Sequence, residues 1–67
     1  MTKKQKIEKI KSEISDLQSD KRSLIGELYE TEDKHECYAI EMEITEIEDK
    51  IKILREKINN LNGIYNV

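Results

Sequence analysis

The stretch Leu28–Cys37, LYETEDKHEC, joins two runs of apolar residues that cannot lie on one straight helix. Both runs show the alternating spacing of three and four residues that is typical of coiled-coil helices. The first run consists of Ile7, Ile10, Ile14, Leu17, Leu24 and Leu28, with Lys21 in its one polar slot. The second run consists of Cys37, Ile40, Ile44, Ile47, Ile51, Leu54, Ile58, Leu61 and Tyr65. Leu28 and Cys37 are nine residues apart, which at about 100° per residue puts the two runs half a turn out of phase.

This change of phase predicts a turn between the two runs. One unbroken helix would carry two apolar stripes on opposite sides, each exposed to water. An all-α fold, the antiparallel two-helix coiled-coil hairpin, places both stripes in one seam. We therefore expect a single domain over 1–67, with a helix over about 3–30, a turn over about 31–33, a second helix over about 34–62 and a short tail over 63–67.

Capping residues agree with these bounds. Thr2 and Gln5 have the spacing of a capping box, and Asp33 and Glu36 repeat it before the second run. The pair Asn62-Gly63 predicts the end of the second helix. The tail that follows either folds onto the open end of the hairpin, stays free or serves as a short partner-binding segment.

The two runs also predict a register. With the heptad positions written a to g and the seam at a and d, the residue numbers in each antiparallel layer add up to 68, as in Leu17 opposite Ile51. Lys21 then faces Ile47. Its stem either lies along the seam with its amine reaching Asp20, Glu48 or solvent, or it acts as a polar device that fixes register or oligomeric state.

Composition excludes several classes of protein. The chain has 67 residues, of which 40% are charged, and it has one cysteine and a net charge of −3. A chain this short does not hold a multidomain enzyme, and one cysteine does not make a disulfide scaffold. No apolar stretch approaches the length of a membrane span or of a secretion signal. We expect a cytoplasmic protein, and the bias toward Ile and Lys favours a phage or a low-GC bacterium as its source.

Four apolar residues lie outside the seam near the turn. Ile25, Tyr29, Tyr38 and Met42 fall on corresponding sides of the two predicted helices, and the register brings 25 level with 42 and 29 level with 38. Gly26 beside them would let a partner backbone approach closely. These residues indicate a patch for a protein partner or for self-association. The alternative is that they are ordinary scattered surface residues.

Neither catalysis nor metal binding is predicted. Asp33, His35, Glu36 and Cys37 lie close together in sequence, but a tetrahedral site would need a further His or Cys, and no orienting third group accompanies a Cys–His pair. No cofactor is expected. The lysines at the start of the chain, with Lys3, Lys4 and Lys6 as candidate phosphate contacts, support a weaker alternative of nucleic-acid binding, which the acidic middle of the chain opposes.

The sequence thus predicts a non-enzymatic regulatory or interaction protein that binds a protein partner, as an inhibitor or adaptor, through a surface of the hairpin. The seam is narrow, and it has to offset roughly 1.5 kcal/mol of ordering entropy for each residue. We therefore expect further burial, with a homodimer that forms a four-helix assembly as the first possibility. The alternative function is a small nucleic-acid-binding hairpin dimer that uses the Lys3–Lys11 region.

Overall fold

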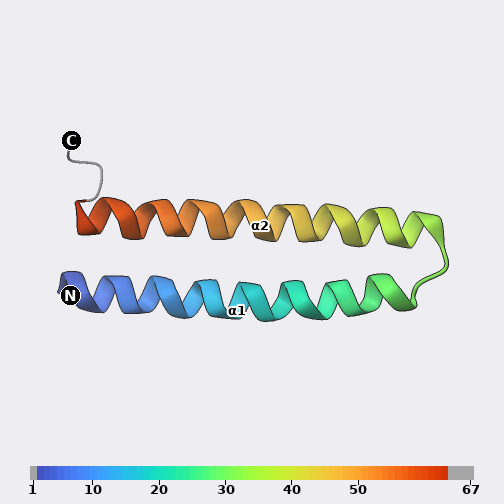
Figure 1. Ribbon diagram of the computed structural model, residues 1–67, viewed down its shortest axis with the longest axis horizontal. Helices are drawn as coiled ribbons and strands as arrows, with labels where there is room; N and C mark the ends of the chain where they lie inside the picture. Colours follow the sequence, from blue (N-terminus) through green and yellow to red (C-terminus); the bar gives the residue numbers. More distant parts are fainter. Residues whose placement is uncertain (1, 64–67) are drawn as a thin grey trace.

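The computed structural model describes residues 2–63, which form two long antiparallel helices (Figure 1). Helix α1 spans Lys3–Glu30 and helix α2 spans Lys34–Asn62. The helices lie side by side, with residues 31–33 connecting them at one end and the start of α1 beside the end of α2 at the other (Figure 1). The predicted all-α helical hairpin is confirmed. The tail over 64–67, including Tyr65, lies outside the described residues.

Both helices begin and end at capping residues. Thr2 and Gln5 form the predicted capping box at the start of α1, with backbone-to-side-chain bonds of 3.0 and 3.1 Å. Gly63 ends α2 in the left-handed conformation, at φ 72°, which a residue without a Cβ adopts at little cost. Asp33 caps the start of α2, and its carboxylate accepts a bond from the backbone N–H of His35 at 2.8 Å. The second capping box was predicted wrongly, because the bond goes to the second helical residue rather than to Glu36.

The core is the predicted seam between the helices. Ile14 and Ile51 are its most buried members, at 8% and 6% exposure. Every other a and d position within 7–61 is partly buried, whereas nearly all the remaining positions of the two helices are exposed. The heptad pattern therefore locates the contact face of both helices, because the helices turn the same apolar stripe toward each other along their whole length.

Two polar contacts across the hairpin agree with the predicted register. Near the turn, the Cys37 thiol donates a weak bond to the carbonyl oxygen of Thr31 at 3.5 Å, which closes the series of layers. At mid-length, the Lys21 amine and the Glu48 carboxylate form an ion pair of 2.9 Å. These two contacts lie at separate points along the hairpin, and a shift of one turn in either helix would break both.

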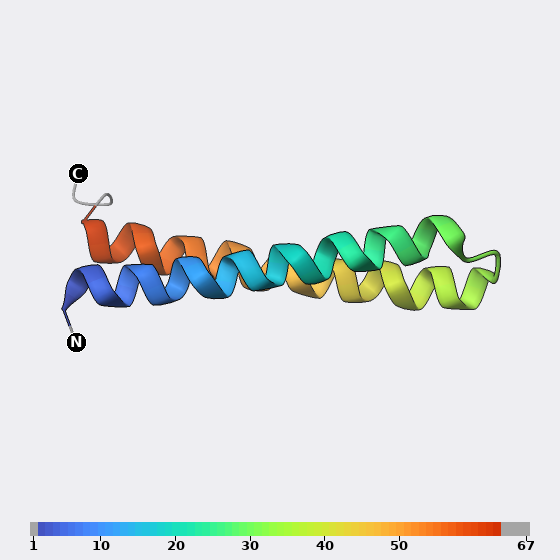
Figure 2. The same ribbon diagram turned by 90° about the horizontal axis from the view of Figure 1, so that it is seen from below.

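The hairpin is an elongated slab, two helices wide and about 46 Å long. Seen from the side in Figure 2, the two ribbons cross near mid-length, so the helices wrap around each other as the heptad repeat predicts. A slab one helix thick has two broad faces, one carrying the e and b positions of both helices and the other carrying the g and c positions. In the described part of the chain, neither helix is long and apolar enough to cross a membrane.

Candidate functional site

The most exposed large apolar side chains near the turn are three of the four predicted patch residues. Tyr29 is 86% exposed, Tyr38 65% and Met42 50%, whereas Ile25 is half-buried at the edge of the seam. We call these four residues the tyrosine patch. Ile25 anchors the patch to the core, and the other three extend from it into solvent.

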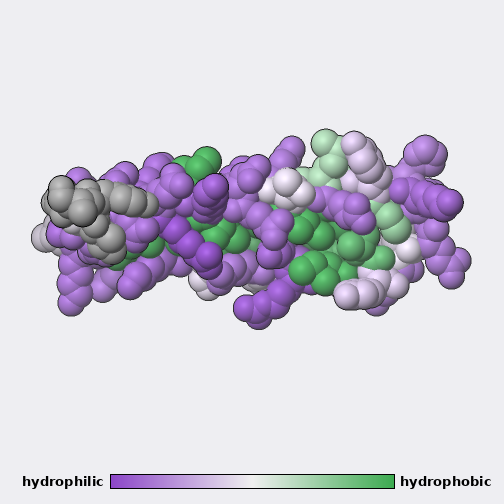
Figure 3. Space-filling model, turned by 45° about the horizontal axis from the view of Figure 1, so that its top comes forward, coloured by the Kyte–Doolittle hydropathy of each residue, from purple (hydrophilic) through white to green (hydrophobic). Residues whose placement is uncertain are grey.

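The patch consists of two pairs of residues four positions apart, one pair on each helix. Ile25 and Tyr29 are neighbours on α1, and Tyr38 and Met42 are neighbours on α2, because residues four apart lie one turn above each other on the same side of a helix. Figure 3 shows apolar side chains gathered on one face over the part of the hairpin far from the chain ends, with charged side chains around them. Such a cluster, apolar at its centre and polar at its rim, is typical of protein-binding surfaces.

Gly26 lies in the exposed surface of α1 next to the patch. A Cβ placed on Gly26 would meet no atom of the chain within 4 Å. Packing within the hairpin therefore does not require glycine here, although glycine inside a helix costs roughly 1 kcal/mol relative to alanine. An external contact that approaches the α1 backbone would account for it.

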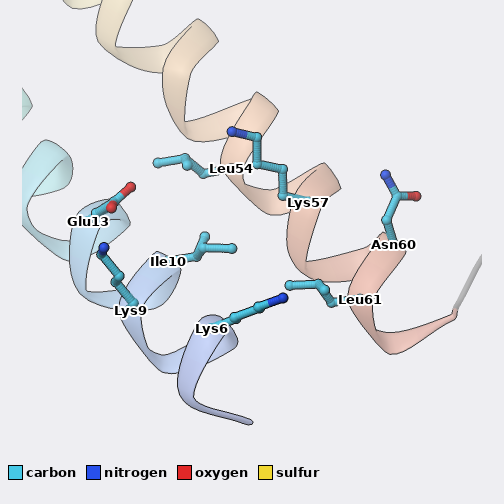
Figure 4. A pocket seen from close by; sticks show the side chains of 8 residues that line it. All are labelled: Lys6, Lys9, Ile10, Glu13, Leu54, Lys57, Asn60 and Leu61. Atoms are coloured by element: carbon cyan, nitrogen blue, oxygen red, sulfur yellow. The ribbon is translucent and has the colours of Figure 1, made fainter. Parts of the chain in front are cut away.

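The candidate phosphate contacts do not form one site. Lys3 and Lys4 line a groove with Ile7 and Lys11, whereas Lys6 lines a different groove on the other broad face. Figure 4 shows this second groove, in which Ile10 of α1 points toward Leu54 and Leu61 of α2. Its charged rim is formed by Lys6, Lys9, Glu13 and Lys57.

The broad face that carries the g and c positions has further grooves, and we call it the groove face. The groove of Figure 4, at the open end, has a volume of about 460 Å³. A second groove of about 290 Å³ follows at mid-length and is lined by Leu17, Ile53 and Leu54. A third, of about 480 Å³, lies near the turn between Glu27 and Ile40. Sequence reasoning missed this face, although Ile53, an isoleucine outside the seam that is 53% exposed, was a visible signal of it.

Opposite charges on one flank of the seam lie near each other without pairing. Glu13 and Lys57 line the same groove, and Asp20 and Lys50 lie on the same face, but neither pair is in ion-pair contact. Among residues 2–63, Lys21 and Glu48 form the one ion pair. The hairpin is held mainly by its apolar seam, and most of its charges are free to meet a partner.

The sequence cluster at the start of α2 is a capping arrangement. Asp33 caps the helix, Cys37 contacts Thr31, and His35 and Glu36 are exposed. Over the described range 2–63, no three side chains of His, Cys, Asp or Glu come together as metal ligands would.

Lys21 gives a direct test of the polar slot in the seam. We expect Lys21→Leu to raise the free energy of unfolding by about 1 kcal/mol, because leucine buries more apolar surface and a partly exposed ion pair contributes about 0–1 kcal/mol. Thermal melting followed by circular dichroism measures the change, with Arg22→Leu, an exposed neighbour, as the control. A lower melting temperature would show that the Lys21–Glu48 pair stabilises the hairpin more than packing does.

Comparison with known proteins adds no relative: no family model, no curated protein and no solved structure matches this chain.

Proposed function

We propose that this chain is a non-enzymatic regulatory protein of the cytoplasm that binds another protein through the tyrosine patch. The observation that carries this proposal is the exposure of Tyr29, Tyr38 and Met42 together near the turn, on a hairpin whose surface is mostly charged or polar. Tyrosine and methionine bring large contact area to an interface, and tyrosine is enriched among the residues that dominate binding energy. Gly26 adds support, since nothing inside the hairpin accounts for it.

A mode of binding follows from the position of the patch. It lies on both helices near the turn, so a partner would contact α1 and α2 together rather than one helix alone. A folded hairpin presents this surface with little rearrangement, which lowers the entropic cost of association. The chain would act by occupying part of its partner's surface, as an inhibitor or an adaptor does.

Photo-crosslinking at the patch tests the proposal. Benzoylphenylalanine replaces Tyr29 with another aromatic residue, and irradiation of cells of the source organism should join the chain to one defined protein. The same group at Ser19, an exposed position at the edge of α1, is the control and should give no such product. An adduct of two copies of this chain, or no adduct at all, would contradict the proposal.

A second candidate function is phosphate binding at the open end of the hairpin. Residues 1–18 and 50–67 together hold nine Lys or Arg against four Asp or Glu, an uneven share for a chain with a net charge of −3. If this end binds nucleic acid, a gel shift should appear in low salt and weaken steeply as salt is added, because phosphate contacts release counterions. Lys3→Glu with Lys4→Glu should abolish it. Absence of a shift in low salt would exclude this function.

A further inference from the structure

Charge is divided along the length of the hairpin. The end that holds the turn, residues 19–49, carries eleven Asp or Glu against three Lys or Arg, whereas the open end carries four against nine. Folding into a hairpin produces this division, because it brings the two basic ends of the sequence together and leaves the acidic middle at the turn (Figure 1). The molecule therefore has an acidic half and a basic half.

The division is sharpest on the groove face. At the turn end, the g and c positions of this face hold six carboxylates and no cation, namely Asp20, Glu27, Glu30, Glu36, Glu43 and Glu46. At the open end, the same positions hold four cations and two carboxylates, namely Lys6, Lys9, Lys50 and Lys57 with Glu13 and Asp16. Because few of these charges pair within the chain, the face is left with two unmatched halves of opposite sign.

The groove face also leaves apolar surface uncovered. The floors of its grooves are seam residues such as Ile10, Leu54 and Ile40, and Ile53 stands half out of the surface. Within residues 2–63 only Ile14 and Ile51 are buried apolar residues, so most of the seam can still gain by losing contact with water. A partner that covers the grooves would complete the core.

We propose that a second copy of the chain covers the groove face, with the two hairpins antiparallel so that the acidic half of each lies on the basic half of the other. A two-fold axis that lies in the interface and runs across the middle of the face, near Leu17 and Ile51, produces this pairing. Glu27 and Glu43 lie about eight to ten residues from that layer toward the turn. Lys9 and Lys57 lie about six to eight residues from it toward the open end, so the symmetry brings these carboxylates and amines together.

The size of the face suits this arrangement. A broad face about 46 Å long and two helices wide, with each helix roughly 10 Å across, is large enough for the roughly 800 Å² that each partner of a standard interface buries. The two-fold arrangement uses the same surface on both copies, so the assembly closes at two hairpins and four helices. A parallel pair would place six carboxylates against six, and like charges across an interface are strongly unfavourable.

This assembly leaves the tyrosine patch free. Ile25 is at an e position and Tyr29 and Tyr38 are at b positions, so the patch lies on the broad face opposite the one through which the dimer forms. One dimer would therefore present two patches facing outward. The inference does not rest on the proposed partner binding, since it is carried by the charges and grooves of the opposite face.

Exchange of charge between the two halves tests the proposal. Glu27→Lys with Glu43→Lys places two lysines opposite Lys9 and Lys57 of the other copy, and Lys9→Glu with Lys57→Glu places two glutamates opposite Glu27 and Glu43. We expect the wild type to be a dimer of twice the 7.9 kDa chain mass in sedimentation equilibrium at low salt. Each variant alone should dissociate about 100-fold more readily, because it sets like charges against each other.

Mixing the two variants supplies the decisive result. In the heterodimer the introduced lysines of one variant face the introduced glutamates of the other, and the unchanged Glu27 and Glu43 face the unchanged Lys9 and Lys57, so the mixture should form a heterodimer at least as tight as the wild-type dimer. The matched control for Glu27→Lys/Glu43→Lys is Glu41→Lys with Asp49→Lys. It makes the same change in net charge outside the groove face and should leave the dimer intact. Circular dichroism verifies that every variant stays helical.

Three outcomes would overturn the proposal. The first is a wild type that stays monomeric at 100 μM in low salt. The second is a Glu27→Lys/Glu43→Lys variant that dimerises as well as the wild type. The third is a mixture of the two variants that remains monomeric. Loss of photo-crosslinking at Tyr29 would leave all three measurements unchanged, so failure of the partner-binding proposal is distinguishable from failure of this one.

Discussion

Ile51→Ala should lower the free energy of unfolding by about 2 kcal/mol or more, the range found when buried isoleucine is truncated to alanine. Ile51 is the most buried residue of the seam, at 6% exposure, and it faces Leu17 at the middle of the hairpin. A hairpin with so few buried residues has little stability to lose, so much of its helical signal should disappear at room temperature. Urea unfolding followed by circular dichroism measures the change.

Ile53→Ala is the matched control for this prediction. It is the same substitution two residues along α2, but Ile53 is 53% exposed, so its truncation should cost no more than about 0.5 kcal/mol. Both variants are compared in 0.5 M salt, where the electrostatic pairing of two hairpins is weakest. Equal losses from Ile51→Ala and Ile53→Ala would contradict the assignment of Ile51 to the core.

Tyr38→Ala with Met42→Ala should weaken binding of the protein partner by about 100-fold or more, because truncating two residues at the centre of an interface commonly costs at least 2–4 kcal/mol. Both side chains are largely in solvent, so helicity should change little. Titration against the protein that crosslinks at position 29 measures the affinity. The same double variant should also lose the crosslink itself.

The control for the patch is a truncation of equal exposure on the opposite broad face. Ile53→Ala removes an apolar side chain about as exposed as Met42, at 53% against 50%, and should leave partner affinity unchanged. If the Tyr38→Ala/Met42→Ala variant bound its partner as well as the wild type, the patch would be ordinary surface.

The hairpin could be predicted from the sequence because two independent signals agree. The half-turn change of phase between Leu28 and Cys37 excludes one straight helix, and the two heptad runs match layer by layer when folded back. The ion pair between Lys21 and Glu48 and the contact between Cys37 and Thr31 then fall where that register puts them. Long heptad patterns predict the buried face of a helix reliably, because many apolar side chains have to lie on the same face.

Details that depend on individual side-chain conformations could not be predicted in the same way. Capping-box spacing at Asp33 and Glu36 permits a bond that the side chains do not form, and opposite charges at Glu13 and Lys57 do not meet. The grooves depend on how side chains from both helices fill the edges of the seam, which no heptad assignment contains. The exposed tyrosines were predictable because they stand outside the periodic pattern.

The distance between Ser12 and Glu56 is the most direct test of the account, because both proposed binding surfaces require the helices to fold back in this register. These two exposed positions lie level with each other on the outer edges of α1 and α2. Each is replaced by cysteine and spin-labelled in a Cys37→Ser background, diluted with unlabelled protein. Pulsed electron paramagnetic resonance should give a distance of roughly 20–30 Å, because the two helix axes lie about 10 Å apart and both labels point outward. An unbroken helix of 44 residues would separate the labels by about 66 Å. A distance near the longer value would contradict the hairpin, the tyrosine patch and the antiparallel dimer together.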